Sequence, residues 1–208
     1  LLLLETLAAS GRGVFINTDS SFTKNPADYA HLQAYTTSKR QFLDWARLVV
    51  AGSAVACVNM RLEHPYGPGD RDDKFVQRMI LDCLAGKPEI DLTPGEQQRD
   101  FVHVDDVVAA YLAVLRRGRP QAGGFVCHEV GTGRTTTIRR MVETIHRVSG
   151  SCSRLNFGAL PYRHGEMMHS VADIASLGQL GYSPAYDLET GLRVTIAAVR
   201  AGHPGSPE

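Results

Sequence analysis

The 208-residue sequence has no excess of charge of either sign, because 22 lysines and arginines balance 22 aspartates and glutamates. A net charge of zero provides no overall basic field of the kind that attracts nucleic acid or an anionic membrane surface. No stretch approaches the ~18 consecutive apolar residues of a transmembrane helix. Glu5 interrupts the opening run Leu1 to Leu4, and no basic residue precedes it, which favours the end of a buried helix over a signal peptide. We therefore expect no nucleic-acid partner and no membrane partner.

Cysteine is also scarce, and the four cysteines are far apart. None forms a C-x-x-C pair, so the usual zinc-site patterns are excluded and no metal site is predicted. Free thiols at this spacing fit a reducing cytoplasm better than a disulfide framework. Hydrophobic residues make up 43% of the chain and charged residues 21%, which is enough apolar material for one substantial core. The sequence predicts a cytoplasmic globular protein.

Apolar runs of strand length alternate with amphipathic stretches of helix length. This alternation is typical of an α/β fold with a parallel sheet and crossover helices. Caps are predicted at Asp105 or Asp106, at Thr137 and at Asp187, each just before an amphipathic stretch. One face of the first of these helices is predicted to be apolar, from Val107, Val108, Tyr111, Leu112 and Leu115. The predicted strands are 13–17, 54–62, 90–92 and 125–130, and the predicted helices are 35–50, 74–84, 105–115, 137–148 and 187–199.

A phenol and an ammonium group, Tyr35 and Lys39, are four residues apart in a predicted helix and therefore share one of its faces. A cation beside a phenol favours the phenolate, which suits such a pair to exchange a proton with a substrate hydroxyl or carbonyl. The pattern thus indicates general acid/base chemistry. The alternative is an ordinary surface tyrosine and lysine at helical spacing.

Polar side chains follow the strand that precedes this helix. Asn17 ends the predicted strand, and Thr18, Asp19 and Ser20 come directly after it. Parallel sheets bind ligands at the carboxyl ends of their strands. These residues are therefore candidates for ligand binding, although Asp19 or Ser20 could instead cap a turn in a polar loop.

A hydroxyl at a strand end followed by Y-x-x-x-K on the next long helix resembles the catalytic triad of the short-chain dehydrogenase/reductase superfamily. The resemblance implies that Thr18 hydrogen-bonds the reacting sugar oxygen and that Tyr35 is the acid/base. It further implies that Lys39 binds the nicotinamide ribose of NAD or NADP.

Further motifs, in the expected order, resemble the extended subgroup, the NAD-dependent epimerase/dehydratase family that modifies nucleotide sugars. The segment Arg61 to Gly69 resembles the strand and loop that pass the nicotinamide and the sugar diphosphate. This implies that Asn17 and Pro65 contact the cofactor, and that His64, where the family commonly has asparagine, contacts the sugar or phosphate.

Three later segments resemble the part of the family that binds the nucleoside-diphosphate sugar. Lys74 and Phe75 lie in a segment that resembles the one flanking the nucleotide, and Arg99 begins an R-D-F-V-H block whose arginine meets the nucleotide. Arg163 lies in a loop that resembles the R-P-G-[DE] loop at the pyrophosphate, with histidine in place of the proline. Asp19 and Ser20 are implied to contact the sugar. The alternative for Arg99 is a structural ion pair with Asp100 or Asp105.

The family's glycine-rich turn, G-x-x-G-x-x-G, is missing before Thr18. In the complete family this turn packs the cofactor pyrophosphate against a helix N-terminus. We therefore expect an incomplete Rossmann-like parallel sheet in residues 1–62 and a smaller α/β substrate-binding part in residues 63–208, with segments near 101–130 returning to the sheet. The sequence is expected to be a fragment, a degenerate gene product, or a chain that another polypeptide complements.

The motifs look closest to 4-ketoreductases and 4-epimerases of deoxysugar pathways, so hydride exchange at sugar C4 is the predicted reaction. Ser20 stands where 4,6-dehydratases have glutamate after the aspartate, which counts against a dehydratase. Two alternatives stay open. The chain could bind a nucleotide sugar through Arg99 and Arg163 without catalysis, or it could serve only dimer contacts through helix 35–50, the helix through which we expect a homodimer.

Overall fold

The computed structural model describes residues 1–24 and 32–202 and is built around a three-stranded parallel sheet. Its strands are β1 (Gly13–Ser20), β2 (Val55–Leu62) and β7 (Phe125–Val130), in the order β1-β2-β7. In register, Thr18 pairs with Met60, and Met60 in turn pairs with His128. The predicted parallel α/β fold is confirmed, and β1 extends three residues beyond the predicted strand, so that it includes Thr18.

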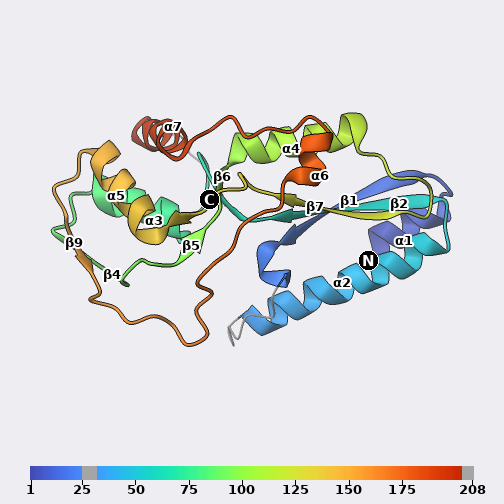
Figure 1. Ribbon diagram of the computed structural model, residues 1–208, viewed down its shortest axis with the longest axis horizontal. Coiled ribbons are helices and arrows are strands. Elements are labelled where there is room, and N and C mark those ends of the chain that lie inside the picture. The colour runs from blue at the N-terminus through green and yellow to red at the C-terminus, as the bar shows by residue number, and fades with distance from the viewer. Residues whose placement is uncertain (25–31, 203–208) are drawn as a thin grey trace.

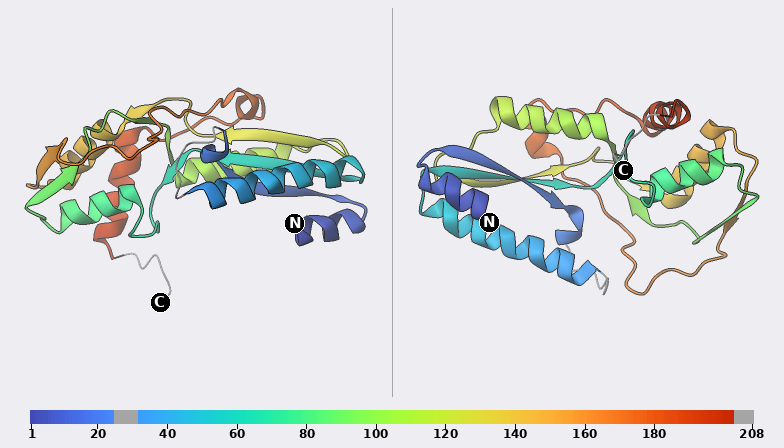
Figure 2. Two further views of the ribbon diagram at one scale, coloured as in Figure 1. Left: turned by 90° about the horizontal axis from the view of Figure 1, so that it is seen from below. Right: turned by 180° about the vertical axis from the view of Figure 1, so that it is seen from behind.

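Helices cover both faces of this sheet (Figures 1 and 2). On one face, α1 (Leu2–Ala9) and α2 (Gln33–Ala51) pack on Val55 and Cys57 of β2. On the other face, α4 (Val104–Arg117) and α6 (Ala175–Gln179) pack on Val58 and Met60. Because successive side chains of a strand point to opposite faces, one apolar strand supplies the core on both sides.

A second core lies at the end of the molecule opposite α1 (Figure 1). It is formed mainly by α3 (Phe75–Leu84), α5 (Ile138–Ser149) and α7 (Leu188–Arg200), with Ile80, Met141, Ile145 and Leu192 completely buried or nearly so. Three two-stranded sheets accompany these helices and connect them to the main sheet. They are β3 (His64–Tyr66) with β6 (Phe101–His103), β4 (Glu89–Leu92) with β9 (Arg154–Phe157), and β5 (Gln98–Arg99) with β8 (Thr136–Thr137).

Two of the predicted helix caps are confirmed, and one is wrong. Thr137 and Asp187 accept hydrogen bonds from the backbone N–H groups of Arg140 and Thr190. Helix α4, however, is capped by His103, whose ring accepts from the Asp105 N–H at 3.3 Å. Asp106 is not available as a cap because its two oxygens accept from the N–H groups of residues 185 and 186.

The predicted apolar face of α4 is wrong in part: Val107 and Tyr111 pack toward the sheet, but the other three predicted residues lie on a second apolar stripe. The stripe of Val107, Ala110 and Val114 packs on the sheet, together with the partly buried Tyr111. Val108, Leu112 and Leu115 lie on the second stripe and are 52%, 41% and 52% exposed. Similarly, only Leu4 of the opening leucine run is buried, while Leu2 and Leu3 are both 75% exposed.

The predicted division at residues 62 and 63 falls where β2 ends, and β7 lies beside β2 in the main sheet. The assignment of the two parts as separate domains stays a prediction. No helix within residues 1–24 and 32–202 has both the length and the apolar character needed to cross a bilayer.

Candidate functional site

A cleft of about 850 Å³ opens at the carboxyl ends of β1 and β2 and extends toward the second core. Its lining comes from η1 (the 3₁₀ turn Ser21–Thr23), α2, β3, α3, β5, α5 and the loop that follows β9. Every residue predicted for the site lines this cleft except Asn17. The cleft thus gathers residues separated by as much as 145 positions, from Thr18 to Arg163.

The predicted catalytic groups lie together at one end of the cleft. Lys39 Nζ donates a hydrogen bond to the backbone oxygen of Thr18 at 2.9 Å and lies 5.4 Å from the centre of the Tyr35 ring. Tyr35 is 42% exposed, so its phenol is open to a ligand. Successive turns of α2 bring Tyr35 and Lys39 together, and the end of β1 brings Thr18 to them. Their assignment as catalytic residues stays a prediction.

Tyr111 of α4 is a residue of this site that the sequence did not reveal. Its hydroxyl oxygen lies 2.6 Å from Thr18 Oγ1, so the two side chains share a hydrogen bond. Burial raises the pKa of Tyr111, and the hydrogen bond with Thr18 opposes that rise only in part. In the sequence Tyr111 has the spacing of a helix core residue, and no local signal links it to Thr18.

The neighbours of Thr18 on β1 are engaged within the protein. Asp19 Oδ2 accepts from Arg61 Nε and Asn59 Nδ2, both at 3.0 Å, and from the Thr23 hydroxyl at 2.8 Å. Ser20 accepts from the backbone N–H of Phe22 at 3.4 Å and caps the turn η1, which is the alternative considered for it above. Asn17 donates to Asn59 Oδ1 at 2.7 Å and is not part of the cleft lining.

A partly buried ion cluster connects the sheet with the cleft. Lys24 Nζ lies 2.6 Å from Glu63 Oε1 and 2.7 Å from Glu129 Oε2, and it also donates to the Val171 carbonyl at 2.8 Å. Ser170 Oγ donates to Glu63 Oε2 at 2.6 Å. These partners are 39 to 147 residues from Lys24, which explains why the sequence did not indicate the cluster.

The cluster holds Glu63 ionised although its side chain is completely buried. Burial alone would raise the pKa of Glu63. The adjacent imidazole of His64, hydrogen bonds from Lys24 and Ser170, and the positive charge of Lys24 together outweigh burial and lower that pKa to about 2. The pKa of Lys24 is raised, which also favours the charged form. Burial lowers this pKa, but the hydrogen bonds to Glu129 and Glu63 outweigh burial.

His64, the residue after Glu63, also lines the cleft. Its Nδ1 lies 3.5 Å from Glu63 Oε2 and forms no hydrogen bond with the described residues. The ring contacts Phe22 and Phe101 edge-on, with centroids 5.8 and 5.9 Å away. The ring therefore packs against two aromatic side chains that line the same cleft as the predicted catalytic groups.

Cationic groups line the cleft beyond His64. Arg99 is only 5% exposed, and its Nη2 lies 3.0 Å from Glu166 Oε1. The alternative ion pair of Arg99 with Asp100 or Asp105 is wrong, because Asp100 instead accepts from the N–H groups of Thr132, Gly133 and Ala172. Arg163 and Lys74 also line this part of the cleft. The cations suit a polyanionic ligand such as a diphosphate.

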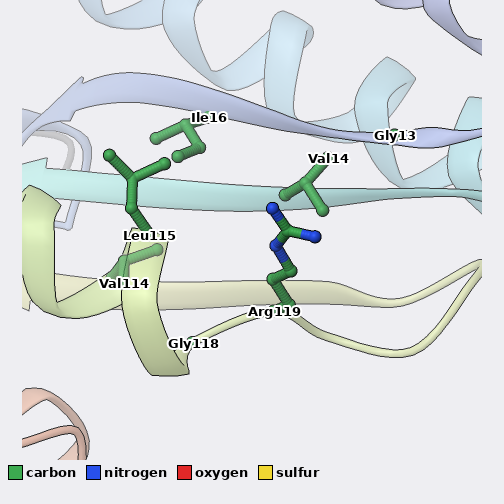
Figure 3. Close-up of a pocket in the computed structure, with 7 residues that line it drawn as sticks. All are labelled: Gly13, Val14, Ile16, Val114, Leu115, Gly118 and Arg119. Atoms are coloured by element: carbon green, nitrogen blue, oxygen red, sulfur yellow. The ribbon is translucent and has the colours of Figure 1, made fainter.

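A second, smaller hollow of about 180 Å³ lies between β1 and the end of α4 (Figure 3). Its side chains are aliphatic apart from Arg119, and the lining carries no acid/base pair. The described residues also hold no group of three or more His, Cys, Asp or Glu that could bind a metal ion. The large cleft is therefore the candidate active site.

A parallel sheet with a hydroxyl at the end of one strand and a Tyr-Lys pair on the following helix defines the short-chain dehydrogenase/reductase class. The model of the NAD dependent epimerase/dehydratase family matches residues 2–126, and the chain belongs to this family. The family resemblance drawn from the motifs is thereby confirmed.

Individual relatives agree with this assignment. CDP-abequose synthase of Salmonella typhimurium is 37% identical over 195 residues, which cover 92% of this chain and 64% of that enzyme. The structure of MoeE5 in complex with UDP-glucuronic acid and NAD is 25% identical, has a TM-score of 0.81 and is matched over 96% of this chain and 69% of its own.

The fold alone is shared with UDP-glucose 4-epimerase of Thermotoga maritima, whose structure was determined with UDP-glucose. That match has 24% identity and a TM-score of 0.82, and it covers 97% of this chain and 68% of the other. This chain thus spans about two thirds of the length of these relatives.

Proposed function

We propose that this chain provides the catalytic and substrate-binding residues of an oxidoreductase or epimerase that acts at C4 of a nucleoside-diphosphate sugar. The observation that carries the proposal is that Tyr35, Lys39 and Thr18 share one cleft with Arg99 and Arg163. The 37% identity with CDP-abequose synthase supports a reductase of a deoxysugar nucleotide.

The proposed cofactor is NAD or NADP, and NAD is favoured by the family and by the complex of MoeE5. Lys39 carries three N–H donors, and the Thr18 carbonyl uses one, so others remain for ribose hydroxyls. Pro65 lines the same end of the cleft. When bound, the nicotinamide supplies or accepts the hydride. The sequence has no glycine-rich turn between a strand and a helix before Thr18. Lys39 and Pro65 are therefore proposed to bind only the nicotinamide half of the cofactor.

The other steps, proton transfer and substrate binding, are assigned to side chains of this chain. Tyr35 transfers the proton to or from the sugar oxygen, and the Thr18 hydroxyl hydrogen-bonds the same oxygen. Lys39 holds a positive charge beside the Tyr35 ring, where it favours the phenolate. Arg99 and Arg163 bind the diphosphate, which orients the sugar toward Tyr35. Lys74, Phe75 and His64 line the same cleft.

Calorimetry and NAD(P)H oxidation together test this proposal. The chain is titrated with NADH or NADPH, and then mixed with a nucleoside-diphosphate 4-keto-6-deoxy sugar while the absorbance of the reduced nicotinamide is followed. We expect saturable cofactor binding, oxidation that depends on the sugar, and a loss of at least about 100-fold in rate for Tyr35→Phe. Binding of the sugar nucleotide with no cofactor binding would instead identify a non-catalytic binding protein.

We further propose a homodimer through α2 and a cytoplasmic location. Helix α2 presents Trp45 and Leu48 to the surface, 55% and 67% exposed, three residues apart and therefore on one face. Phe42, Ala46 and Val49 instead pack against the sheet core. The four cysteines are all free, as expected of thiols in a reducing compartment.

A further inference from the structure

The residues that line the cleft indicate which parts of a bound sugar nucleotide would lie at its two ends. At one end are Tyr35 and Lys39, and His64 contacts Phe101. From Phe101 the backbone runs back through Arg99, which pairs with Glu166, to residue 97 beside β4. The β4 end lies at the far side of the molecule from α2 (Figure 1). If the sugar lies at Tyr35 and the diphosphate at Arg99, the nucleoside lies beside residue 97.

Gln97 is the polar side chain of this far end that lacks a complete set of partners. It lines the cleft and is 5% exposed. Its Nε2 reaches Thr93 Oγ1 only at 3.5 Å, and its Oε1 is buried with no hydrogen-bond partner among the described residues. A buried carbonyl without a donor is unfavourable, and in native proteins such groups are rare.

The backbone around Gln97 is held firmly in place. Its carbonyl accepts from the Ile138 N–H at 2.9 Å, and the Gly95 carbonyl accepts from the Arg139 N–H at 2.9 Å. Gly95 has φ of +79°, and a Cβ there would lie 2.9 Å from the Arg139 nitrogen, so a larger residue would separate this segment from α5. The backbone that carries the Gln97 side chain is therefore fixed against α5.

We propose that Gln97 determines nucleoside specificity by accepting, at Oε1, a hydrogen bond from the nucleoside of the bound sugar nucleotide. The inference rests on the proposed function and deepens it. The required chemistry is a hydrogen-bond donor on the nucleoside. The nucleoside of CDP offers two such donors, the exocyclic amine of cytosine and a ribose hydroxyl, whereas uracil presents a carbonyl at the position of that amine and carries its own donor at the adjacent N3–H.

Isothermal titration of the 208-residue chain with CDP, UDP, 2′-deoxy-CDP and inorganic pyrophosphate tests the inference. The variant is Gln97→Met, which keeps the side-chain length and removes both polar atoms. Gln98→Met is the matched control, because Gln98 is the next residue of the same segment, is exposed, and is absent from the cleft lining. Thermal unfolding shows that each variant folds. Gln97→Asn, which withdraws the amide by one methylene, is the second test if Gln97→Met does not fold.

We expect Gln97→Met to weaken CDP binding about tenfold and to leave pyrophosphate binding unchanged. If cytosine is the donor, the wild-type chain prefers CDP to UDP by about tenfold and the variant loses this preference. If a ribose hydroxyl is the donor, CDP and UDP bind equally, 2′-deoxy-CDP binds about tenfold more weakly, and the variant loses that difference instead.

Three results would overturn the inference. Unchanged CDP binding by Gln97→Met would remove Gln97 from the nucleoside site while leaving the proposed function intact. An equal loss of CDP and pyrophosphate binding would show that the substitution only disturbs the cleft. A wild-type chain that binds none of the four probes would overturn both the inference and the proposed function.

Discussion

The hydroxyl groups of Thr18 and Tyr111 lie 2.6 Å apart, so a strand end and a helix that are 93 residues apart in sequence share one hydrogen bond. Thr18 is the proposed partner of the reacting sugar oxygen, and Tyr111 comes from α4, on the face of the sheet opposite α2. The geometry of the proposed catalytic hydroxyl therefore depends on both faces of the sheet.

A double-mutant cycle with Thr18→Val and Tyr111→Phe measures this contact. We expect each substitution to lower the free energy of unfolding by about 1 kcal/mol, and the pair to show a coupling of similar size. Urea denaturation followed by the fluorescence of Trp45, the one tryptophan, provides the measurement. Tyr186→Phe, whose hydroxyl bonds Asp105, is the control and should not couple to Thr18. Strictly additive effects of the first pair would refute a shared bond.

Stability should fall in acid because of Glu63. Its pKa is lowered from 4.5 to about 2 in the folded protein, so the unfolded chain binds the proton first. The stabilisation from its ionised form is complete above about pH 4.5 and is lost as the pH falls toward 2.

The variant Glu63→Gln should lower the free energy of unfolding at pH 7 by roughly 3 kcal/mol, because it removes the fully buried one of the two carboxylates that pair with Lys24. The difference from wild type should shrink as the pH approaches 2. Glu189→Gln is the control, since Glu189 bridges Arg147 and Arg193 at the exposed surface, where water and salt screen the pair. A constant difference between Glu63→Gln and wild type over this pH range would contradict the prediction.

Glu166 should weaken anion binding. Its carboxylate pairs with Arg99 and adds a negative charge beside the proposed diphosphate site. We expect Glu166→Gln to bind inorganic pyrophosphate about fivefold more tightly at low salt, with a smaller gain at high salt. Calorimetry at two ionic strengths checks this, with the exposed Glu143→Gln as a control outside the cleft. Weaker binding by Glu166→Gln would show that Glu166 positions Arg99 and does not compete with the ligand.

Charges on α2 should prevent the proposed dimer. Trp45→Glu combined with Leu48→Glu introduces four like charges into a symmetric interface while changing only exposed positions. Sedimentation should show a dimer for the wild-type chain and a monomer for the variant. Leu112→Glu on α4, also an exposed leucine, is the control and should remain dimeric. A wild-type monomer, or a variant that still dimerises, would place the interface elsewhere or remove it.

Gly131 should not tolerate a side chain. A Cβ there would collide with the Asp100 carboxylate and approach the Ala172 Cβ to 2.7 Å. Asp100 is fully buried and bonded to three backbone N–H groups, so it has no room to shift. We expect Gly131→Ala to lower the free energy of unfolding by about 2 kcal/mol. Gly178→Ala, where nothing lies within 4 Å, should have little effect on the melting temperature.

Much of the fold could be predicted because its signals are local. The run 54–62 is apolar on both sides and forms β2, which is buried on both faces, and Thr137 and Asp187 cap helices as their side chains suggest. The prediction of the apolar face of α4 was wrong in part, because the periodicity of apolar residues does not distinguish a buried stripe of a helix from an exposed one. Only packing decides whether Val114 or Leu112 faces the sheet.

Some residues of the candidate site could likewise be predicted from local sequence patterns, and others could not. The spacing of Tyr35 and Lys39, and the order of the motifs up to Arg163, were readable as a pattern along the chain. Lys24 and Tyr111 were missed because their partners lie 39 to 147 and 93 residues away, respectively, and nothing in their immediate neighbours records those contacts.

The sequence by itself determined the alternation of strands and helices, the Tyr-Lys pair on one helix face and the family to which the chain belongs. These properties depend on residue type and on short, regular spacing, which a linear pattern carries completely. The tertiary structure alone decided which charges are buried together, which hydroxyl bonds Thr18, and how the Gln97 side chain is buried in the cleft wall. Those contacts arise when distant segments meet in a close-packed interior, where the partner of each polar group depends on the whole fold.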